Sequence, residues 1–323
     1  MKFPGCLGKG QNEILAEPSP GWPGGSIGQG FGAWRGFLLA TLGLALCFGW
    51  PLYRLAQFAF ESELYSYILL MPFVSFYLVW LKRQEMPRHS RPDWGLAALF
   101  LAAGFAVLTA YWFVGRSALK LAIDDRLAFT TSSFLLLFLG VCSLFLGREA
   151  LRTMAFPLAM LVFLVPLPVF LEEQVETISQ YGSAIIAHAM FSLSGASFFR
   201  EGLVFHLPGI PIQVAPECSG IHSSLVLLIT SLLAGHLFLR SPGKRALLTL
   251  IVIPLGLLRN GFRIFTIGQL CVHIGPEMID SPIHRRGGPL FFLLSLVPFL
   301  LLLVLLRKFD RASENIKPKQ LEA

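Results

Sequence analysis

Long apolar runs separated by short polar loops dominate the sequence. Crossing the hydrocarbon core of a bilayer as a helix takes about 18 residues or more. Runs that approach or exceed this length lie at 36–52, 64–81, 95–114, 128–146, 153–171, 219–239, 246–268 and 289–306. The pattern predicts an all-α polytopic integral membrane protein with about eight transmembrane helices.

Two polar stretches interrupt this pattern in the second half of the chain. Residues 172–195 carry Glu172, Glu173 and Glu176 and are too polar for a span, so we expect an interfacial or re-entrant helix on the outer side. Residues 200–218 combine Gly, Pro and alternating apolar positions, which predicts a short extended loop or hairpin on that side.

Composition supports the membrane interpretation, and charge adds an orientation. The chain is 54% hydrophobic and 14% charged, whereas soluble domains average about 25% charged residues. If the N-terminus is cytoplasmic, the inner segments hold 17 Lys and Arg and the outer segments hold 7, as the positive-inside rule requires. The net charge of +7 therefore reflects topology, and we expect no nucleic-acid partner.

The domain organisation follows from these runs. We expect a disordered cytoplasmic tail over 1–35, a transmembrane catalytic domain over 36–306 and a basic cytoplasmic tail over 307–323. Both termini then face the cytoplasm, and membrane lipid is an expected partner, whereas the oligomeric state is left open.

The candidate chemistry gathers at the outer ends of the last three spans. Cys218, between Glu217 and Ser219, directly precedes an apolar run, where helix N–H groups and the helix dipole favour the reactive thiolate. Arg259 and Arg263 lie four residues apart at membrane depth, which marks them as functional candidates together with Asn260.

Two histidines are candidate proton carriers on the same side. His284 directly precedes the final span, and His222 follows Cys218 by four residues, on the same face if the two share a helix. A cysteine, an arginine and a histidine at one membrane depth suit acyl transfer, which needs a nucleophile, a cation for the oxyanion and a proton carrier. This chemistry requires neither a cofactor nor a metal.

Four stretches together resemble the exosortase/archaeosortase family of membrane cysteine transpeptidases, over roughly residues 50–306. The first is Glu201-Gly202 through Val214 to Ile221, similar to the family's "REG…V…CSG" block, and the second is Asn260-Gly261-Phe262-Arg263-Ile264, similar to "NxxR[IV]". The third is His284 with Gly288, similar to "HxxxG". The fourth is Tyr65 to Pro72 with Trp80 to Arg83, like the family's second span. The order and spacing of the three core motifs carry the resemblance, since each motif alone is weak.

The resemblance implies a catalytic site of Cys218, Arg263 and His284 facing away from the cytoplasm. Glu217, Ser219, His222, Arg259 and Asn260 are then substrate-binding or supporting residues. Family members are thought to cleave a C-terminal sorting signal of secreted proteins, often in exopolysaccharide-producing bacteria. This signal combines a short Pro-Glu-Pro-like motif, a transmembrane helix and a basic tail. The resemblance implies cleavage through a thioester, transfer to an acceptor, and a multi-pass location in the bacterial cytoplasmic (inner) membrane with a periplasmic active site.

The sequence departs from the family pattern at two places. His222 stands where many members have Arg, which leaves open whether His222 or His284 is the working base. His284 is followed by Arg285 and Arg286, which could tune the substrate motif.

Three alternatives from other classes remain. The first is a transporter or flippase of an anionic lipid-linked substrate that uses the arginines. The second is a metal site built from Cys218, His222 and His284. The third is a disulfide between Cys218 and Cys271, which would disable the nucleophile.

Overall fold

The computed structural model describes residues 27–87, 91–116, 121–215, 220–281 and 287–316, most of them in helices. The helices are α1 (Ile27–Cys47), α2 (Gly49–Glu61), α3 (Met71–Leu81), α4 (Trp94–Arg116), α5 (Ile123–Thr153), α6 (Ala155–Met160), α7 (Val169–Leu193), α8 (Ile221–Phe238), α9 (Pro242–Leu250), α10 (Val252–His273) and α12 (Gly288–Ile316). Short 3₁₀ helices lie at Ser66–Leu70, Leu161–Leu164 and Pro276–Asp280. The strands are β1 (Phe199–Glu201), β2 (Val204–Leu207) and β3 (Ile210–Gln213).

The structure is predominantly helical, as a polytopic membrane protein requires, but it does not confirm a count of eight spans. Within the described ranges, five helices are long and apolar enough to cross a membrane: α4, α5, α8, α9 continued by α10, and α12. The number rises to seven if two bent pairs each form one span, namely α1 with α2, bent by 68°, and Ala155–Leu164 with α7, bent by 91°. The predicted span at 64–81 corresponds to an apolar helix, Ser66–Leu81, of less than full spanning length.

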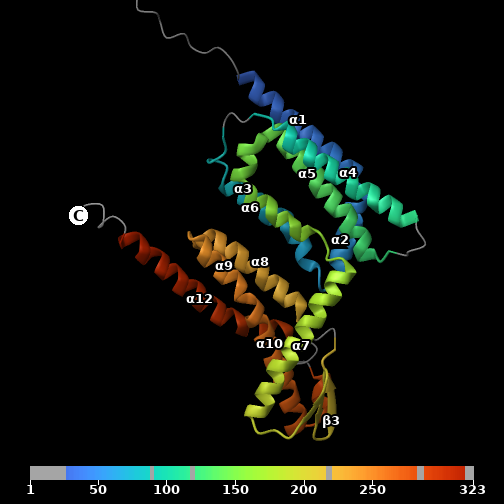
Figure 1. The fold of residues 1–323 in the computed structure, drawn as a ribbon, viewed down its shortest axis with the longest axis vertical. Coiled ribbons are helices and arrows are strands. Elements are labelled where there is room, and N and C mark those ends of the chain that lie inside the picture. The colour runs from blue at the N-terminus through green and yellow to red at the C-terminus, as the bar shows by residue number, and fades with distance from the viewer. Residues whose placement is uncertain (1–26, 88–90, 117–120, 216–219, 282–286, 317–323) are drawn as a thin grey trace, which may run out of the picture.

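The helices form two groups, and a further pair, α7 and α10, lies beside them (Figure 1). α1, α4 and α5 pack together in one group, and α8, α9 and α12 lie in the other. α7 packs along α10, and these two helices carry the three strands at the end of the molecule opposite α1. The strands therefore sit beside α7 and α10, away from the N-terminal group.

Glycines set the close approach of α4 and α5. A Cβ atom at Gly104 would lie 2.8 Å from Leu137 Cγ, and one at Gly140 would lie 2.8 Å from Leu101 Cγ. The Ser133 hydroxyl donates a hydrogen bond to the Gly104 carbonyl across the same contact, at 2.9 Å. Small residues and interhelical hydrogen bonds of this kind hold helices together in a bilayer, where burial of apolar surface gives no driving force.

Two of the predicted helix boundaries depend on single residues. Gly147 adopts φ 75° and ψ 174° inside α5, so the regular helix is broken at the residue after the predicted span 128–146. Pro168 precedes α7 with extended backbone, and it separates α7 from the short helical turns before it. The predicted span 153–171 is therefore divided near its end. α1 begins at Ile27, inside the stretch that we predicted as a tail.

The polar stretches after this bend form a helix and a small sheet. α7 covers the predicted interfacial or re-entrant segment, and the predicted extended loop contains three antiparallel strands in the order β1-β2-β3. Apolar side chains of the strands pack on α7 and α10 in one buried cluster: Ala184, Ala187, Phe191, Phe205, Leu207, Ile212, Val214, Ile264, Ile267 and Cys271. The sheet is thus anchored to the two helices, and β3 leads the chain toward the start of α8.

Candidate active site

The start of α8 is held against α10. Gly220 precedes α8 in the left-handed conformation, with φ 71°. A Cβ atom there would lie 3.1 Å from both Arg259 Nη2 and Asn260 Cγ, so a side chain would fit only if these groups moved by a few tenths of an ångström. Glycine is favoured at this position for both its conformation and its size.

Arg259 makes the direct connection between these helices. Its Nη2 donates hydrogen bonds to the Gly220 carbonyl at 2.9 Å and to the Ser224 hydroxyl at 3.1 Å. The residue is only 7% exposed, and its Nη1 is buried with no hydrogen-bond acceptor in the described part of the chain. The sequence correctly marked Arg259 as unusual, but its partner Ser224 was not predicted.

Asn260 connects the same turn of α10 to α7. Its Nδ2 donates a hydrogen bond to the Ser183 hydroxyl at 3.0 Å, and both residues are buried. Gly261 brings the helices close, since a Cβ atom there would lie 2.7 Å from Ile186 Cγ2. Arg259 and Asn260 thus fix α10 between α8 and α7.

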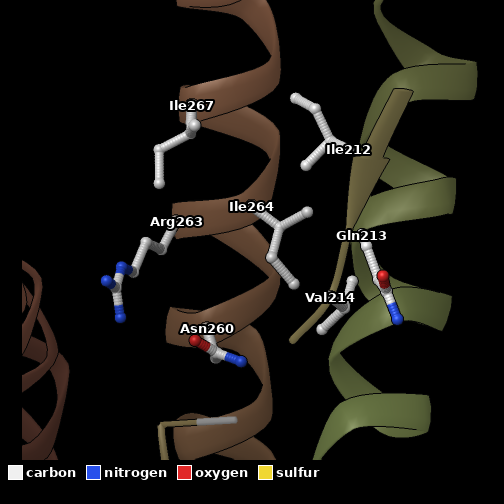
Figure 2. A pocket seen from close by; sticks show the side chains of 7 residues that line it. All are labelled: Ile212, Gln213, Val214, Asn260, Arg263, Ile264 and Ile267. Carbon is white, nitrogen blue, oxygen red and sulfur yellow. The ribbon is translucent and has the colours of Figure 1, made fainter. Parts of the chain in front are cut away.

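Arg263 lies one turn further along α10, at a narrow pocket against β3. The pocket has a volume of only about 20 Å³ and is lined by Ile212, Gln213, Val214, Asn260, Arg263, Ile264 and Ile267. Figure 2 shows Ile212 and Ile264 facing each other between β3 and α10, whereas the Arg263 side chain extends on the other side of α10. The positive charge of Arg263 also acts on Arg259. Two cations therefore lie one helical turn apart.

His222 fixes the first turn of α8 to another part of the chain. Its Nδ1 lies 3.1 Å from the Leu64 carbonyl oxygen, and since a carbonyl only accepts, Nδ1 carries the proton. α8 begins at Ile221, directly after Gly220 with its positive φ, so His222 lies in the first turn of the helix. The predicted relation between Cys218 and His222 is not tested, because Cys218 lies outside the described ranges.

Tyr65 extends this network to α7. Its hydroxyl donates a hydrogen bond to Glu172 Oε2 at 2.9 Å, and the side chain is almost fully buried. Burial, with the hydrogen bond to Glu172, holds the pKa of Tyr65 far above its ordinary value. The Tyr65–Glu172 pair was not predicted, although Tyr65 belongs to one of the stretches that resemble the family. The pair joins the segment before α3 to the start of α7.

Four candidate residues fall outside the described ranges: Glu217, Cys218, Ser219 and His284. The structure therefore brings together Gly220, Arg259 and Asn260, and Arg263 and His222 lie one turn or less away along their helices. It does not test the placement of Cys218, the predicted nucleophile, or of His284.

Two of the alternatives can be compared with these coordinates. Cys271 is a free cysteine, 2% exposed in the apolar cluster beneath the strands, and its predicted disulfide with Cys218 is not tested because Cys218 lies outside the described ranges. No three His, Cys, Asp or Glu side chains in the described ranges lie together as metal ligands. The proposed metal site itself is not tested, because Cys218 and His284 lie outside those ranges.

Comparison with known proteins identifies the family. The family model described as transmembrane exosortase (Exosortase_EpsH) matches residues 55–301, which is most of the chain and includes every candidate site residue. No curated protein and no solved structure matches the chain. The family match does not favour the transporter alternative. It covers both motif blocks that the structure brings into contact at Gly220, and the chain therefore belongs to the transmembrane exosortase family.

Proposed function

We propose that this exosortase is a membrane cysteine transpeptidase that removes a C-terminal sorting signal from secreted proteins. The signal consists of a short motif, a transmembrane helix and a basic tail, and the cleaved protein passes to an acceptor. In this proposal the reaction takes place at the periplasmic face of the bacterial inner membrane, and both termini of the enzyme lie in the cytoplasm.

One contact carries the proposal. The Arg259 guanidinium binds the Gly220 carbonyl across 39 residues of sequence. Gly220 lies in the motif block that holds Cys218, and Arg259 directly precedes the block that begins at Asn260 and holds Arg263. Because the contact is buried and leaves little space for a side chain at Gly220, it supports a close approach of the two blocks.

The proposed reaction has two steps with one covalent intermediate. The Cys218 thiolate attacks the substrate carbonyl carbon, and Arg263 stabilises the oxyanion of the tetrahedral intermediate. His284 donates a proton to the leaving amine as the C–N bond breaks, which leaves a thioester on Cys218. The acceptor nucleophile then gives a proton to His284 and attacks the thioester, and the Cys218 thiolate departs. Water in place of the acceptor would give hydrolysis.

The remaining candidates position these groups. Arg259 holds the start of α8 through the Gly220 carbonyl, and Asn260 fixes α10 on α7. His222 anchors α8 through the Leu64 carbonyl, which favours His284 as the base and leaves His222 as a positioning residue. Glu217 and Ser219, which flank Cys218, support the nucleophile or bind the substrate motif.

The test uses membranes that contain the full-length enzyme and a candidate substrate with such a tail. Wild type should release the tail, and Cys218→Ser should not. Cys47→Ser is the matched control, because Cys47 is an exposed free cysteine on α1 and should be dispensable. Trapping of a substrate–enzyme thioester that hydroxylamine cleaves would establish the intermediate. Equal tail release by wild type and Cys218→Ser would refute the nucleophile and reopen the transporter alternative.

A further inference from the structure

A second recess lies at the opposite end of α8 from Gly220. It is an open recess of about 430 Å³ between α6, α8 and α9, lined by Phe156, Leu232, Gly235, His236, Arg245, Ala246, Thr249 and Leu250. His236 is separated from Gly220 by about 24 Å along the helix, at 1.5 Å per residue. The recess is therefore distinct from the candidate active site.

The lining of this recess is apolar on one side and cationic on the other. The Phe156 ring stacks on the His236 imidazole, with centroids 3.7 Å apart and planes within 3°. Arg245 lines the recess, and the charges of Arg245 and Lys82 both act on His236, opposed by the exposed Glu85. The facing charges are thus predominantly positive.

A hydrogen bond to a nearby backbone carbonyl holds the Arg245 side chain in place. Its Nε donates a hydrogen bond to the Leu239 carbonyl at 2.8 Å, just beyond the end of α8. Within the described ranges its terminal nitrogens make no hydrogen bond, so the planar end of the guanidinium remains available to an anion. A guanidinium fixed in this way suits a phosphate, which it can bind through two parallel hydrogen bonds.

The recess lies at the level where several helices end. α3 ends at Leu81 with Lys82 as its cap, and α8 ends at Phe238. Exposed apolar side chains flank it, with Leu250 62% exposed and Phe238 47% exposed. Nearby on α3, the Arg83 guanidinium stacks over the Trp80 ring at 4.3 Å. Exposed apolar side chains beside Lys, Arg and Trp are typical of the boundary between membrane and water.

We propose that this recess binds one anionic phospholipid. Its phosphate contacts Arg245, Lys82 and His236, and an acyl chain lies along Phe156, Leu232 and Leu250. The combination of a cationic rim and an apolar floor favours a lipid over a soluble phosphate or an acidic peptide, since neither would use the floor. On the predicted topology the site faces the cytoplasmic leaflet, which is rich in anionic lipids. The inference does not depend on the proposed peptide chemistry.

The test measures binding of dioleoyl phosphatidylglycerol to the purified full-length protein in neutral detergent, by native mass spectrometry. We expect one retained lipid, weaker binding of dioleoyl phosphatidylcholine and no competition by glycerol 3-phosphate. Arg245→Gln should weaken retention about tenfold or more, as expected for a lost hydrogen bond to a charged group. Arg152→Gln removes the same charge from an exposed position at the end of α5 and should have no effect.

A second variant tests the space of the recess without changing its charge. Ala246 lines the recess but is exposed, so Ala246→Trp should fill the space without disturbing the buried core. Loss of lipid in both Ala246→Trp and Arg245→Gln supports the site. Equal weakening by Arg245→Gln and Arg152→Gln, full retention by Ala246→Trp, equal binding of phosphatidylcholine, or displacement by glycerol 3-phosphate would each overturn it.

Discussion

Replacing Gly220 by alanine tests the contact that joins the two motif blocks. Gly220 combines a positive φ of 71° with little space for a Cβ atom. The added methyl group would lie 3.1 Å from Arg259 Nη2, the atom that donates to the Gly220 carbonyl. The substitution therefore strains the backbone and also displaces the guanidinium.

The two costs can be estimated separately. A left-handed conformation costs an L-residue about 1–2 kcal/mol. Weakening a hydrogen bond from a charged donor to a buried carbonyl costs about 1.5–3 kcal/mol more. A shift of the start of α8 by about 1 Å would also reduce turnover by about a hundredfold, if the segment before it carries the nucleophile.

Gly195 provides the matched control for Gly220. It has φ 70°, but a Cβ atom there would have no neighbour within 4 Å. Gly195→Ala should lower the free energy of unfolding in mixed micelles by the backbone cost alone and should leave tail release unchanged. Gly220→Ala should show the additional loss and greatly reduced tail release. Equal effects of the two substitutions on stability and on turnover would refute the reasoning.

Three further predictions concern the neighbours of this contact. Arg263→Lys should reduce tail release about a hundredfold or more while substrate still binds, because lysine cannot reproduce the planar fork at the oxyanion; near-normal turnover would exclude this role. Asn260→Ala should lower the free energy of unfolding by about 1–3 kcal/mol, since it leaves the buried Ser183 hydroxyl without this partner. In a double-mutant cycle, adding Ser183→Ala to this variant should restore part of the lost stability. Tyr65→Phe should cost about 1 kcal/mol near neutral pH. Because the raised pKa of Tyr65 favours its neutral form in the folded state, this stabilisation is complete below pH 10.0 and is lost above it, so alkaline unfolding curves of wild type and Tyr65→Phe should converge.

The sequence predicted the fold class because apolar run length responds to a single physical demand, the thickness of the bilayer. It predicted span boundaries less well where the chain bends. The break before α7 follows Pro166 and Pro168, and a Pro-x-Pro pattern is a recognisable signal of a helix end. The 68° bend between α1 and α2 also has a local signal, because Pro51 lacks the N–H that would continue the helix by bonding to the Cys47 carbonyl, where α1 ends.

The candidate site was predictable to the extent that single residues are unusual for their surroundings. Arg259 and Arg263 stand out as charges at membrane depth, and Asn260 stands beside them. Their partners Ser183 and Ser224 do not stand out, since serines are common in membrane helices and these contacts join distant segments. The helix pattern also does not reveal the left-handed conformation of Gly220, which sets the start of α8.

The two arginines of α10 have different environments, and these imply different roles. Arg259 is buried and uses Nη2 on a backbone carbonyl and a serine, and no carboxylate in the described residues neutralises its charge. Arg263 is less buried and borders the pocket against β3. An uncompensated buried cation is costly, and an enzyme benefits from such a charge where a negative charge develops during the reaction. A fixed positive potential from Arg259 would favour both a thiolate and an oxyanion, whereas in the proposed mechanism it is Arg263 that contacts the reacting group. Arg259→Gln should therefore shift the pH profile of cysteine alkylation upward, and Arg263→Gln should chiefly lower turnover.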